Sequence, residues 1–376
     1  MKKCLVIPDS FKGTMSATQI CEIYKKQLAQ HFPQCEVKAV PVADGGEGTV
    51  DCFLYALPDC EKIAMQSADP FGEPCDVYYA RRGDTAIIEM AMCAGLPQVE
   101  GRENPELTST YGVGAMIAHA MENGCTEILL GLGGSCTNDC GTGMAEALGV
   151  KFYDENGNIL SMAGGKMGLV KHIDTKGANP LLKSCKITAM CDIDNPLCGE
   201  TGAAYMFGPQ KGADAEMVKR LDAGLAHIAE IVEKDLGKKT AHIRGAGAAG
   251  GMGAGVVAFL GGELKQGIDA VLDVVGYDEM LDGADVVFTG EGRIDEQSLH
   301  GKVVVGVAGR AAKRGVPVVA IVGCIEPGAE GAYDMGVSAI FSTNRRPEPF
   351  ETARLKCTQT LEATIGDVLR LWKARG

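Results

Sequence analysis

The sequence predicts an α/β protein with two domains, one of which is a discontinuous doubly wound (flavodoxin- or Rossmann-like) domain with the other, a mixed α/β domain, inserted in it. Three observations predict this fold. Short apolar strand runs alternate with amphipathic helical runs at both ends of the chain, whereas strand runs follow one another directly in part of the middle. The 376 residues exceed the ~100–150 typical of one domain. Polar or glycine-rich loops follow most of the strand runs, as at the ligand-binding edge of such sheets.

The first sixty residues predict a β-α-β-α order. Residues 4–7 are a continuous apolar run, typical of a strand that is covered on both faces, and a polar stretch follows it at once. Ser16 and Gln19 have the spacing of a capping box, so a helix is expected to start there. Its apolar stripe has helical period and comprises Ile20, Ile23, Tyr24 and Leu28. Residues 38–42 predict the second strand.

The middle of the chain changes character. Residues 62–66, 75–80 and 85–90 read as strands joined by turn-forming sequences, which predicts a local antiparallel meander. Residues 127–130 predict a strand followed by a glycine loop and a helix that ends at Gly149, and residues 187–190 predict another strand. A long amphipathic helix is expected from Met217, ending near Gly237.

The C-terminal part returns to α/β alternation. Strands are expected at residues 284–288, 316–322 and 339–341. Residues 301–314 are predicted as a helix, although Val303–Val305 favours a strand locally, because two neighbouring parallel strands require a crossover. The final helix is expected to carry Leu355, Leu361, Ile365 and Leu369.

The domain prediction follows from this order of elements. Residues 1–65 plus 276–376 are expected to form the discontinuous doubly wound domain, and residues 66–275 the inserted α/β domain. Because ligands of open α/β sheets bind beyond the carboxyl ends of the strands, the active site is expected in the cleft between the two domains.

Composition excludes several classes of partner. With 36 basic and 49 acidic residues the net charge is −13, which disfavours nucleic acid. No apolar run approaches the ~18 residues of a membrane span, so no membrane partner is expected. The 15 scattered cysteines are typical of free thiols in a reducing compartment, and a cytoplasmic location is expected. The six histidines never have H-x-x-x-H spacing, which gives a zinc site little support.

Carboxylates follow predicted strands at four places. They are Asp9; Asp44 with Glu47; Asp192 with Asp194; and Glu291 with Asp295. Such groups either hold a hard cation such as Mg²⁺ or act as bases, and Lys12, Lys211, Arg293 and Lys302 beside these loops could meet anionic oxygens. Carboxylates together with basic side chains at one site are typical of enzymes that transfer phosphoryl groups. The plainer alternative, that each aspartate caps a helix or closes a turn, is about equally favoured at any one position.

Two glycine-rich segments are candidates for phosphate binding. Residues 131–139 follow a strand and precede a helix, so their amides could surround a phosphate. Gly245–Gly250 matches G-x-G-x-x-G, a pattern that alone suggests a dinucleotide, but residues 240–244 are a poor strand to precede it. A Walker A loop and the protein-kinase motifs are absent from the sequence.

Seven motifs, taken in order, resemble the bacterial glycerate kinase family, in its glycerate 2-kinase branch. They begin at Pro8, Ala43, Gly133, Cys191, Gly208, Gly247 and Thr289 and span nearly the whole chain. The resemblance implies phosphorylation of D-glycerate by ATP and Mg²⁺, usually on the 2-hydroxyl to give 2-phosphoglycerate, between two α/β domains. Cys136 and Cys140 stand where the family is expected to have Ala and Gly, and Ser298 where Thr is usual.

The resemblance and the loop positions together predict a role for each site residue. Asp192 is the first choice for the base and Asp295 the second, with Lys12 assisting phosphate transfer. Arg293 is expected to bind the glycerate carboxylate through its guanidinium fork, with Ser10 and Asp9 in the same substrate site. Asp44 and Glu291 are expected to hold the metal. The nucleotide phosphates are expected to contact Gly133, Gly134, Ser135, Thr137, Asn138, Gly250 and Gly251.

Two other functions stay open at this point. An NAD(P)-dependent oxidoreductase of a small hydroxy acid would rest on Gly245–Gly250, and a non-catalytic sugar-acid sensor would need neither a base nor a cation. In each case the expected partner is a small molecule. The protein itself is expected to be a monomer or a homodimer.

Overall fold

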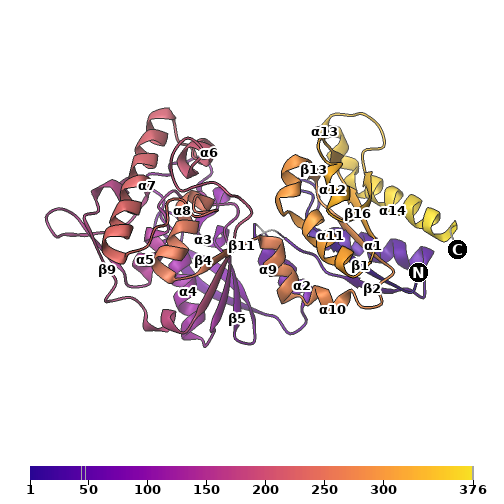
Figure 1. Ribbon diagram of the computed structural model, residues 1–376, viewed down its shortest axis with the longest axis horizontal. Coiled ribbons are helices and arrows are strands. Elements are labelled where there is room, and N and C mark those ends of the chain that lie inside the picture. Colours follow the sequence, from indigo (N-terminus) through magenta and orange to yellow (C-terminus); the bar gives the residue numbers. More distant parts are fainter. Residues whose placement is uncertain (44, 47, 375–376) are drawn as a thin grey trace. The chain divides into compact units, whose positions relative to one another are not determined.

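The computed structural model of the chain describes residues 1–43, 45, 46 and 48–374 (Figure 1). The chain divides into two compact units. Unit 1 comprises Met1–Asp44, Asp51–Pro58 and Gln266–Gly376, and unit 2 comprises Gly45–Val50 and Asp59–Lys265. The domain boundaries expected at residues 65 and 275 stay a prediction.

Unit 1 contains a five-stranded parallel sheet in the order β16-β14-β12-β1-β2. Numbered along the chain, this is the 2-1-3-4-5 order of doubly wound flavodoxin-like sheets, as predicted. The strands are β1 (Lys3–Pro8), β2 (Glu36–Ala39), β12 (Val286–Gly290), β14 (Val318–Val322) and β16 (Val337–Ser342), with a separate short pair of β13 (Arg293–Ile294) and β15 (Cys324–Ile325).

Helices cover both faces of the sheet in unit 1. On one face α1 and α14 pack together over Cys4, Val6 and Phe288, and on the other α11 contacts β12 and β14. The capping box at Ser16 is present as the sequence predicts. The helices are α1 (Ala17–His31), α9 (Gly267–Val274), α10 (Tyr277–Met280), α11 (Val303–Lys313), α12 (Gly331–Asp334), α13 (Phe350–Ala353) and α14 (Cys357–Ala374); the residues of α2 (Thr49–Ala56) fall in both units.

Unit 2 contains a mixed six-stranded sheet in the order β11-β10-β6-β5-β4-β3. The predicted meander is its antiparallel end, and the pairs from β5 to β11 are parallel. Its strands are β3 (Glu61–Ala68), β4 (Pro74–Arg82), β5 (Thr85–Glu89), β6 (Glu127–Gly131), β10 (Lys186–Met190) and β11 (Glu263–Lys265). A small antiparallel sheet joins β7 (Lys151–Tyr153), β8 (Ile159–Leu160) and β9 (His172–Asp174).

The helices of unit 2 surround a separate hydrophobic core. The long predicted helix is α7, and Gly237 ends it in a left-handed conformation at φ +68°. The helices are α3 (Ala91–Ala94), α4 (Tyr111–Glu122), α5 (Thr142–Ala147), α6 (Ala203–Phe207), α7 (Ala215–Leu236) and α8 (Ala248–Gly255). Within the described part of the chain, no helix combines the length and apolar character that crossing a membrane requires.

Several predicted element boundaries differ from the structure, for example β12 at Val286–Gly290 where residues 284–288 were expected. Three further differences bear on the core and on the candidate site. Strand β2 ends at Ala39, but Val40 and Val42 stay buried because their amides bond to carbonyls of β1. The glycine loop after β6 does not lead directly into a helix, since α5 begins only at Thr142. Leu355 precedes α14 and is 79% exposed, so it does not belong to the buried stripe of that helix.

Candidate active site

The first group of candidate residues lies at the topological switch point of unit 1. Strands β1 and β12 are neighbours here, and the Asp9 amide donates to Gly290 O at 2.9 Å. Asp9 and Glu291 therefore follow the carboxyl ends of adjacent central strands, where doubly wound proteins bind ligands. Both residues are buried, with 6% and 5% exposure.

Glu291 is a buried carboxyl group with a raised pKa and one oxygen without a hydrogen-bond partner in the described part of the chain. Burial raises its pKa to about 7, the negative charges of Asp9 and Asp295 act in the same direction, and Lys302 opposes them. Its Oε1 atom is buried and has no hydrogen-bond partner among the described residues. A buried carboxylate oxygen in this state suits a hard cation.

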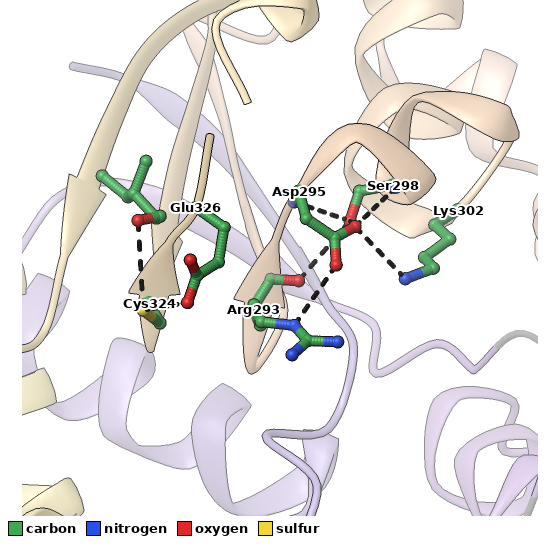
Figure 2. A network of polar contacts seen from close by, with 7 residues as sticks. Arg293, Asp295, Ser298, Lys302, Cys324 and Glu326 are labelled. Carbon is green, nitrogen blue, oxygen red and sulfur yellow. Dashed lines mark hydrogen bonds and ion pairs between the residues drawn. The ribbon is translucent and has the colours of Figure 1, made fainter. Parts of the chain in front are cut away.

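Asp295 organises a polar network at the end of β13 (Figure 2). It caps a short 3₁₀ helix (Glu296–His300) and accepts hydrogen bonds from Ser298 N at 2.9 Å and Ser298 Oγ at 3.1 Å. Arg293 Nε lies 3.2 Å from its Oδ2, and Lys302 Nζ lies 3.9 Å from its Oδ1. Burial alone would raise the pKa of Asp295, but Ser298, Lys302 and Arg293 outweigh burial and lower it. An ionised carboxylate held this way is a weak proton acceptor.

The loop after β1 forms a tight turn. Phe11 and Met15 exchange backbone hydrogen bonds of 2.8 and 3.0 Å, and Gly13 turns the chain at φ +77°. Ser10 N donates to Asp9 Oδ1 at 2.6 Å, and Lys12 lies at the exposed tip of the turn. Asp9, Ser10, Lys12, Glu291, Arg293 and Asp295 thus follow the ends of neighbouring strands within unit 1, as the sequence indicated.

The second group lies at one edge of the sheet in unit 2. Met190 at the end of β10 pairs with Gly131 at the end of β6, so Asp192 and the loop at residues 131–139 leave the sheet on the same side. Asp192 is partly buried. Asp194, two residues further, is ion-paired with Arg244 at the surface.

The glycines after β6 allow close backbone packing. A Cβ on Gly133 would lie 2.4 Å from Gly46 Cα, and the Gly133 amide already donates to Gly45 O at 3.0 Å. Gly134 has φ +75°, a left-handed conformation that favours glycine. The Gly133 amide therefore already has an acceptor within the chain, unlike an amide that is free to bind a ligand.

Lys211 was predicted only as a basic side chain that could meet anionic oxygens, without a specific site role. It is buried at 2% exposure and donates to Ser135 Oγ at 2.8 Å and to Thr137 O at 2.7 Å. Burial lowers its pKa to about 8, and Cys136 and Asp139 act against that shift. Its burial and its contacts with Ser135 and Thr137 were not predicted, although its place in one of the seven motifs was a sign that it matters.

The loop that Lys211 contacts contains buried polar atoms without partners in the part of the chain that is described. Thr137 Oγ1 and both side-chain polar atoms of Asn138 are buried and have no hydrogen-bond partner among the described residues. Asp139, by contrast, is saturated, because it accepts hydrogen bonds from Thr110 N and Oγ1, Gly141 N and Gly143 N at 2.8–3.2 Å. Asp139 therefore fixes the loop, whereas Thr137 and Asn138 have unused polar groups for a ligand or water.

Gly250 and Gly251 pack against the backbone of the same loop. A Cβ on Gly250 would lie 2.0 Å from Thr137 O, and Gly250 O accepts the Cys140 amide at 3.0 Å. Both glycines are buried and left-handed, at φ +69° and +91°. Residues 237–247, all of which are described, contain no strand, so Gly245–Gly250 lacks the β-α context of a dinucleotide fingerprint.

The predicted carboxylate set for a metal is incomplete here. Asp44 lies outside the described residues. Among the residues that are described, no group of three or more His, Cys, Asp or Glu side chains could hold a metal by itself. Glu89 was predicted only as part of a strand. Its carboxylate accepts hydrogen bonds from the amides of Gly48 and Val50 at 3.2 and 2.5 Å, and so stabilises the start of α2.

This fold, with acidic and amide-rich loops after the strands, is typical of an α/β enzyme acting on a small anionic substrate. Residues 4–373 match the glycerate kinase family. The chain is 42% identical to glycerate kinase of Bacillus cereus, covering 99% of this chain and 98% of the relative, and 43% identical to glycerate 2-kinase of Escherichia coli K12, covering 90% of each. A Salmonella typhimurium LT2 crystal structure assigned to glycerate kinase 2 superposes with a TM-score of 0.88 at 37% identity, covering 99% of this chain and 98% of that one. The chain belongs to the glycerate kinase family.

Proposed function

We propose that the protein transfers the terminal phosphoryl group of ATP to a hydroxyl of D-glycerate, the 2-hydroxyl, giving 2-phosphoglycerate. The observation that carries the proposal is the whole-length similarity to relatives named glycerate kinase and glycerate 2-kinase. The chemistry of the loops supports it, because carboxylates follow strands in both units, Lys12 follows β1 in unit 1, and the buried Lys211 contacts the loop after β6 in unit 2. Nothing in the structure favours the oxidoreductase, since its glycine motif lacks a preceding strand.

Mg²⁺ fits the carboxylates of unit 1. The buried Glu291 Oε1 has no described hydrogen-bond partner, and the charge of Asp9 acts on the same carboxylate. One or two carboxylates are what Mg²⁺ ordinarily takes from a protein, the rest of its shell being waters and substrate phosphates. When bound, the ion would neutralise charge on the transferred phosphoryl group. Glu291 is the proposed ligand, with Asp44 as the further candidate.

The remaining roles are assigned to side chains of both units. Asp192 is the proposed general base for the attacking hydroxyl, and Arg293, with Asp9 and Ser10, is proposed to bind the glycerate carboxylate. Lys12, Gly134, Ser135 and Thr137 are proposed to contact phosphate oxygens. Because Lys211 donates to Ser135 and Thr137, it would hold that loop in shape.

A coupled ADP-release assay with D-glycerate and close analogues tests the reaction, and phosphorus NMR of the product identifies the hydroxyl that is phosphorylated. D-glycerate is expected to give ADP and 2-phosphoglycerate in equal amounts. Binding of D-glycerate without ADP release would contradict the proposal and favour a sensor.

Substitution of Asp192 tests the proposed base. Asp192→Asn keeps the size of the side chain but removes its proton affinity, so turnover is expected to fall by ~10²–10⁴ while the fold persists. Asp194→Asn is the matched control, because this neighbouring aspartate is paired with Arg244 at the surface. Near-normal turnover of Asp192→Asn would remove Asp192 from the role.

A further inference from the structure

Unit 1 contains a cavity of about 230 Å³, and of the described residues that line it only Lys12 has a role in the proposed reaction. Residues that follow four strands of its sheet line it: Lys12 after β1, Gly292 after β12, Cys324 after β14 and Asn344 after β16. Residues of α13 and the start of α14 form the rest of the wall. The cavity thus lies at the carboxyl ends of the strands, where doubly wound sheets bind nucleotides and other ligands.

The wall of the cavity suits a flat, neutral ring. Phe11 and Phe350 supply aromatic surface, and the Phe350 ring is 58% exposed, with its Cζ only 3.8 Å from where a Gly13 Cβ would lie. Such an exposed aromatic ring offers a face on which a nucleobase can stack. The amide of Asn344 can donate and accept together, as the edge of an adenine requires.

The size and apolar lining of the cavity argue against the small acid as occupant. Glu348 lines the cavity and is largely buried, and its carboxylate is shared between Arg346 and Lys356, each at 3.1 Å. Because Lys12 and Arg354 also line the cavity, charge does not decide between occupants, but an anion of three carbons would leave the aromatic wall uncovered. The volume is below the ~300–1,000 Å³ of pockets for whole drug-sized ligands, so it suits one ring system.

We propose that this cavity binds the adenine ring of the nucleotide, with Phe350 stacking on the base and Asn344 contacting its edge. The inference rests on the proposed use of ATP and adds the part of unit 1 that recognises the nucleotide. Lys12 and Gly292 line the cavity and belong to the same loops as Asp9 and Glu291. A nucleotide whose base occupies the cavity therefore has its phosphate side at the carboxylate proposed to bind Mg²⁺.

Two cysteines in the wall allow a test that does not depend on catalysis. Cys324 and Cys357 line the cavity and are half-buried, and Cys324 Sγ contacts Glu326 at 3.4 Å (Figure 2). Adenosine or ATP, added to the full chain without D-glycerate, is expected to slow iodoacetamide alkylation of both several-fold, as measured by mass spectrometry. Cys60 and Cys185 are half-buried controls in unit 2 whose alkylation should not change. Protection by D-glycerate instead of adenosine, or by neither, would overturn the inference.

Substitution of Phe350 tests the stacking contact. Loss of one base-stacking ring is worth about 5- to 100-fold in affinity, so Phe350→Ala is expected to raise the KM for ATP in that range and to leave the KM for D-glycerate unchanged. Tyr333→Ala is the matched control, since Tyr333 is 50% exposed on α12 of the same unit and does not line the cavity. An unchanged KM for ATP in Phe350→Ala would contradict stacking on this ring.

The two proposals can fail separately. If adenosine protects both cysteines but no phosphoglycerate forms, the adenine site stands and the proposed reaction fails. If 2-phosphoglycerate forms while adenosine gives no protection and Phe350→Ala has a normal KM for ATP, the reaction stands and the adenine site is elsewhere.

Discussion

Lys211 is buried with two uncharged acceptors, a hydroxyl and a backbone carbonyl. A lysine ammonium in the interior is costly unless hydrogen bonds and nearby negative charge compensate for lost hydration. The buried and unsatisfied polar atoms of Thr137 and Asn138 lie in the loop that Lys211 holds. We interpret the lysine as a positioning residue whose charge also favours an anionic ligand at this loop.

Replacing Lys211 separates its effect on catalysis from its effect on stability. Lys211→Met keeps the length of the side chain and removes its charge, so the melting temperature is expected to change by only a few degrees, because an apolar side chain of similar volume can replace a buried charge at little cost. Turnover is expected to fall by ~10²-fold or more, because Ser135 and Thr137 lose the contact that fixes them.

Lys211→Arg is the conservative comparison. The guanidinium keeps the charge, and partial recovery of turnover relative to Lys211→Met is expected if charge at this position matters. Turnover of Lys211→Met within a few-fold of the wild type would contradict the positioning role.

The pKa of Glu291 gives stability a defined pH dependence. Burial raises this pKa from 4.5 to about 7, so below pH 4.5 the folded and unfolded states both bind the proton. Between pH 4.5 and 7 the unfolded chain releases the proton first, and the free energy of unfolding is expected to fall as pH rises, by about 3 kcal/mol in total from this group. Glu291→Gln removes this contribution.

Denaturant unfolding in metal-free buffer at several pH values measures the effect. The free energy of unfolding of Glu291→Gln relative to the wild type should rise between pH 4.5 and 7 and level off above 7. A constant difference across this range would mean that the carboxyl group titrates normally.

At the scale of elements, the spacing of apolar residues was sufficient to predict a helix or strand that buries one face. The capping box of α1, the meander β3-β4-β5 and the end of α7 near Gly237 were all predicted correctly from local pattern. Residues 303–305 lie in α11, although their local sequence favours a strand. The helix was predicted only because the parallel strands on either side of it require a crossover.

The shape of the loop after β6 could not be predicted from local sequence. Its shape depends on Asp139, which bonds to Thr110 from a distant part of the sequence, and on Gly250, which packs against Thr137. Nothing local indicates these contacts. One sign was present in the resemblance: glycine was expected where Cys140 stands, and Cys140 has φ +55°, the left-handed region that favours glycine.

The support of this loop by Gly250 can be tested with a pair of alanine substitutions. Gly250 and Gly261 have similar left-handed conformations, at φ +69° and +67°, but only a Cβ on Gly250 meets backbone, 2.0 Å from Thr137 O. Gly261→Ala is expected to cost about 1–2 kcal/mol in unfolding free energy for its backbone conformation alone. Gly250→Ala is expected to cost more and to lower turnover as well. Equal stability losses with normal turnover in both variants would contradict the supporting role.

At the scale of the molecule, the two units have separate hydrophobic cores. The core of unit 1 includes Phe288, whose ring lies 5.4 Å from that of Tyr24, and the core of unit 2 includes Phe152, 5.7 Å from Phe259. A chain with two separate cores can unfold in two steps.

Calorimetry is expected to resolve two unfolding transitions. Phe288→Leu should lower one of them and Phe152→Leu the other, each by a few degrees, because each substitution removes packing from only one core. A single transition that both variants shift equally would show that the units unfold cooperatively.

The sequence predicted where most of the candidate residues lie along the chain, but not how they are grouped. The sequence identified the loops after β1, β12, β6 and β10, because polar residues directly after buried strands are visible in the pattern. The ion pairs of Asp295, the engaged amide of Gly133 and the burial of Lys211 were not visible, since they depend on packing between segments far apart in the chain. The cleft shared by both groups stays a prediction.

The order of strands in unit 1 also bears on biosynthesis. Strand β1 lies between β2 and β12, yet β12 begins only at Val286, after the whole of unit 2 has been made. As the ribosome releases the chain from its N-terminus, unit 2 can complete its core while the first strand still lacks a neighbour on one side. During translation the opening strand therefore remains unpaired on one side until the last quarter of the polypeptide emerges.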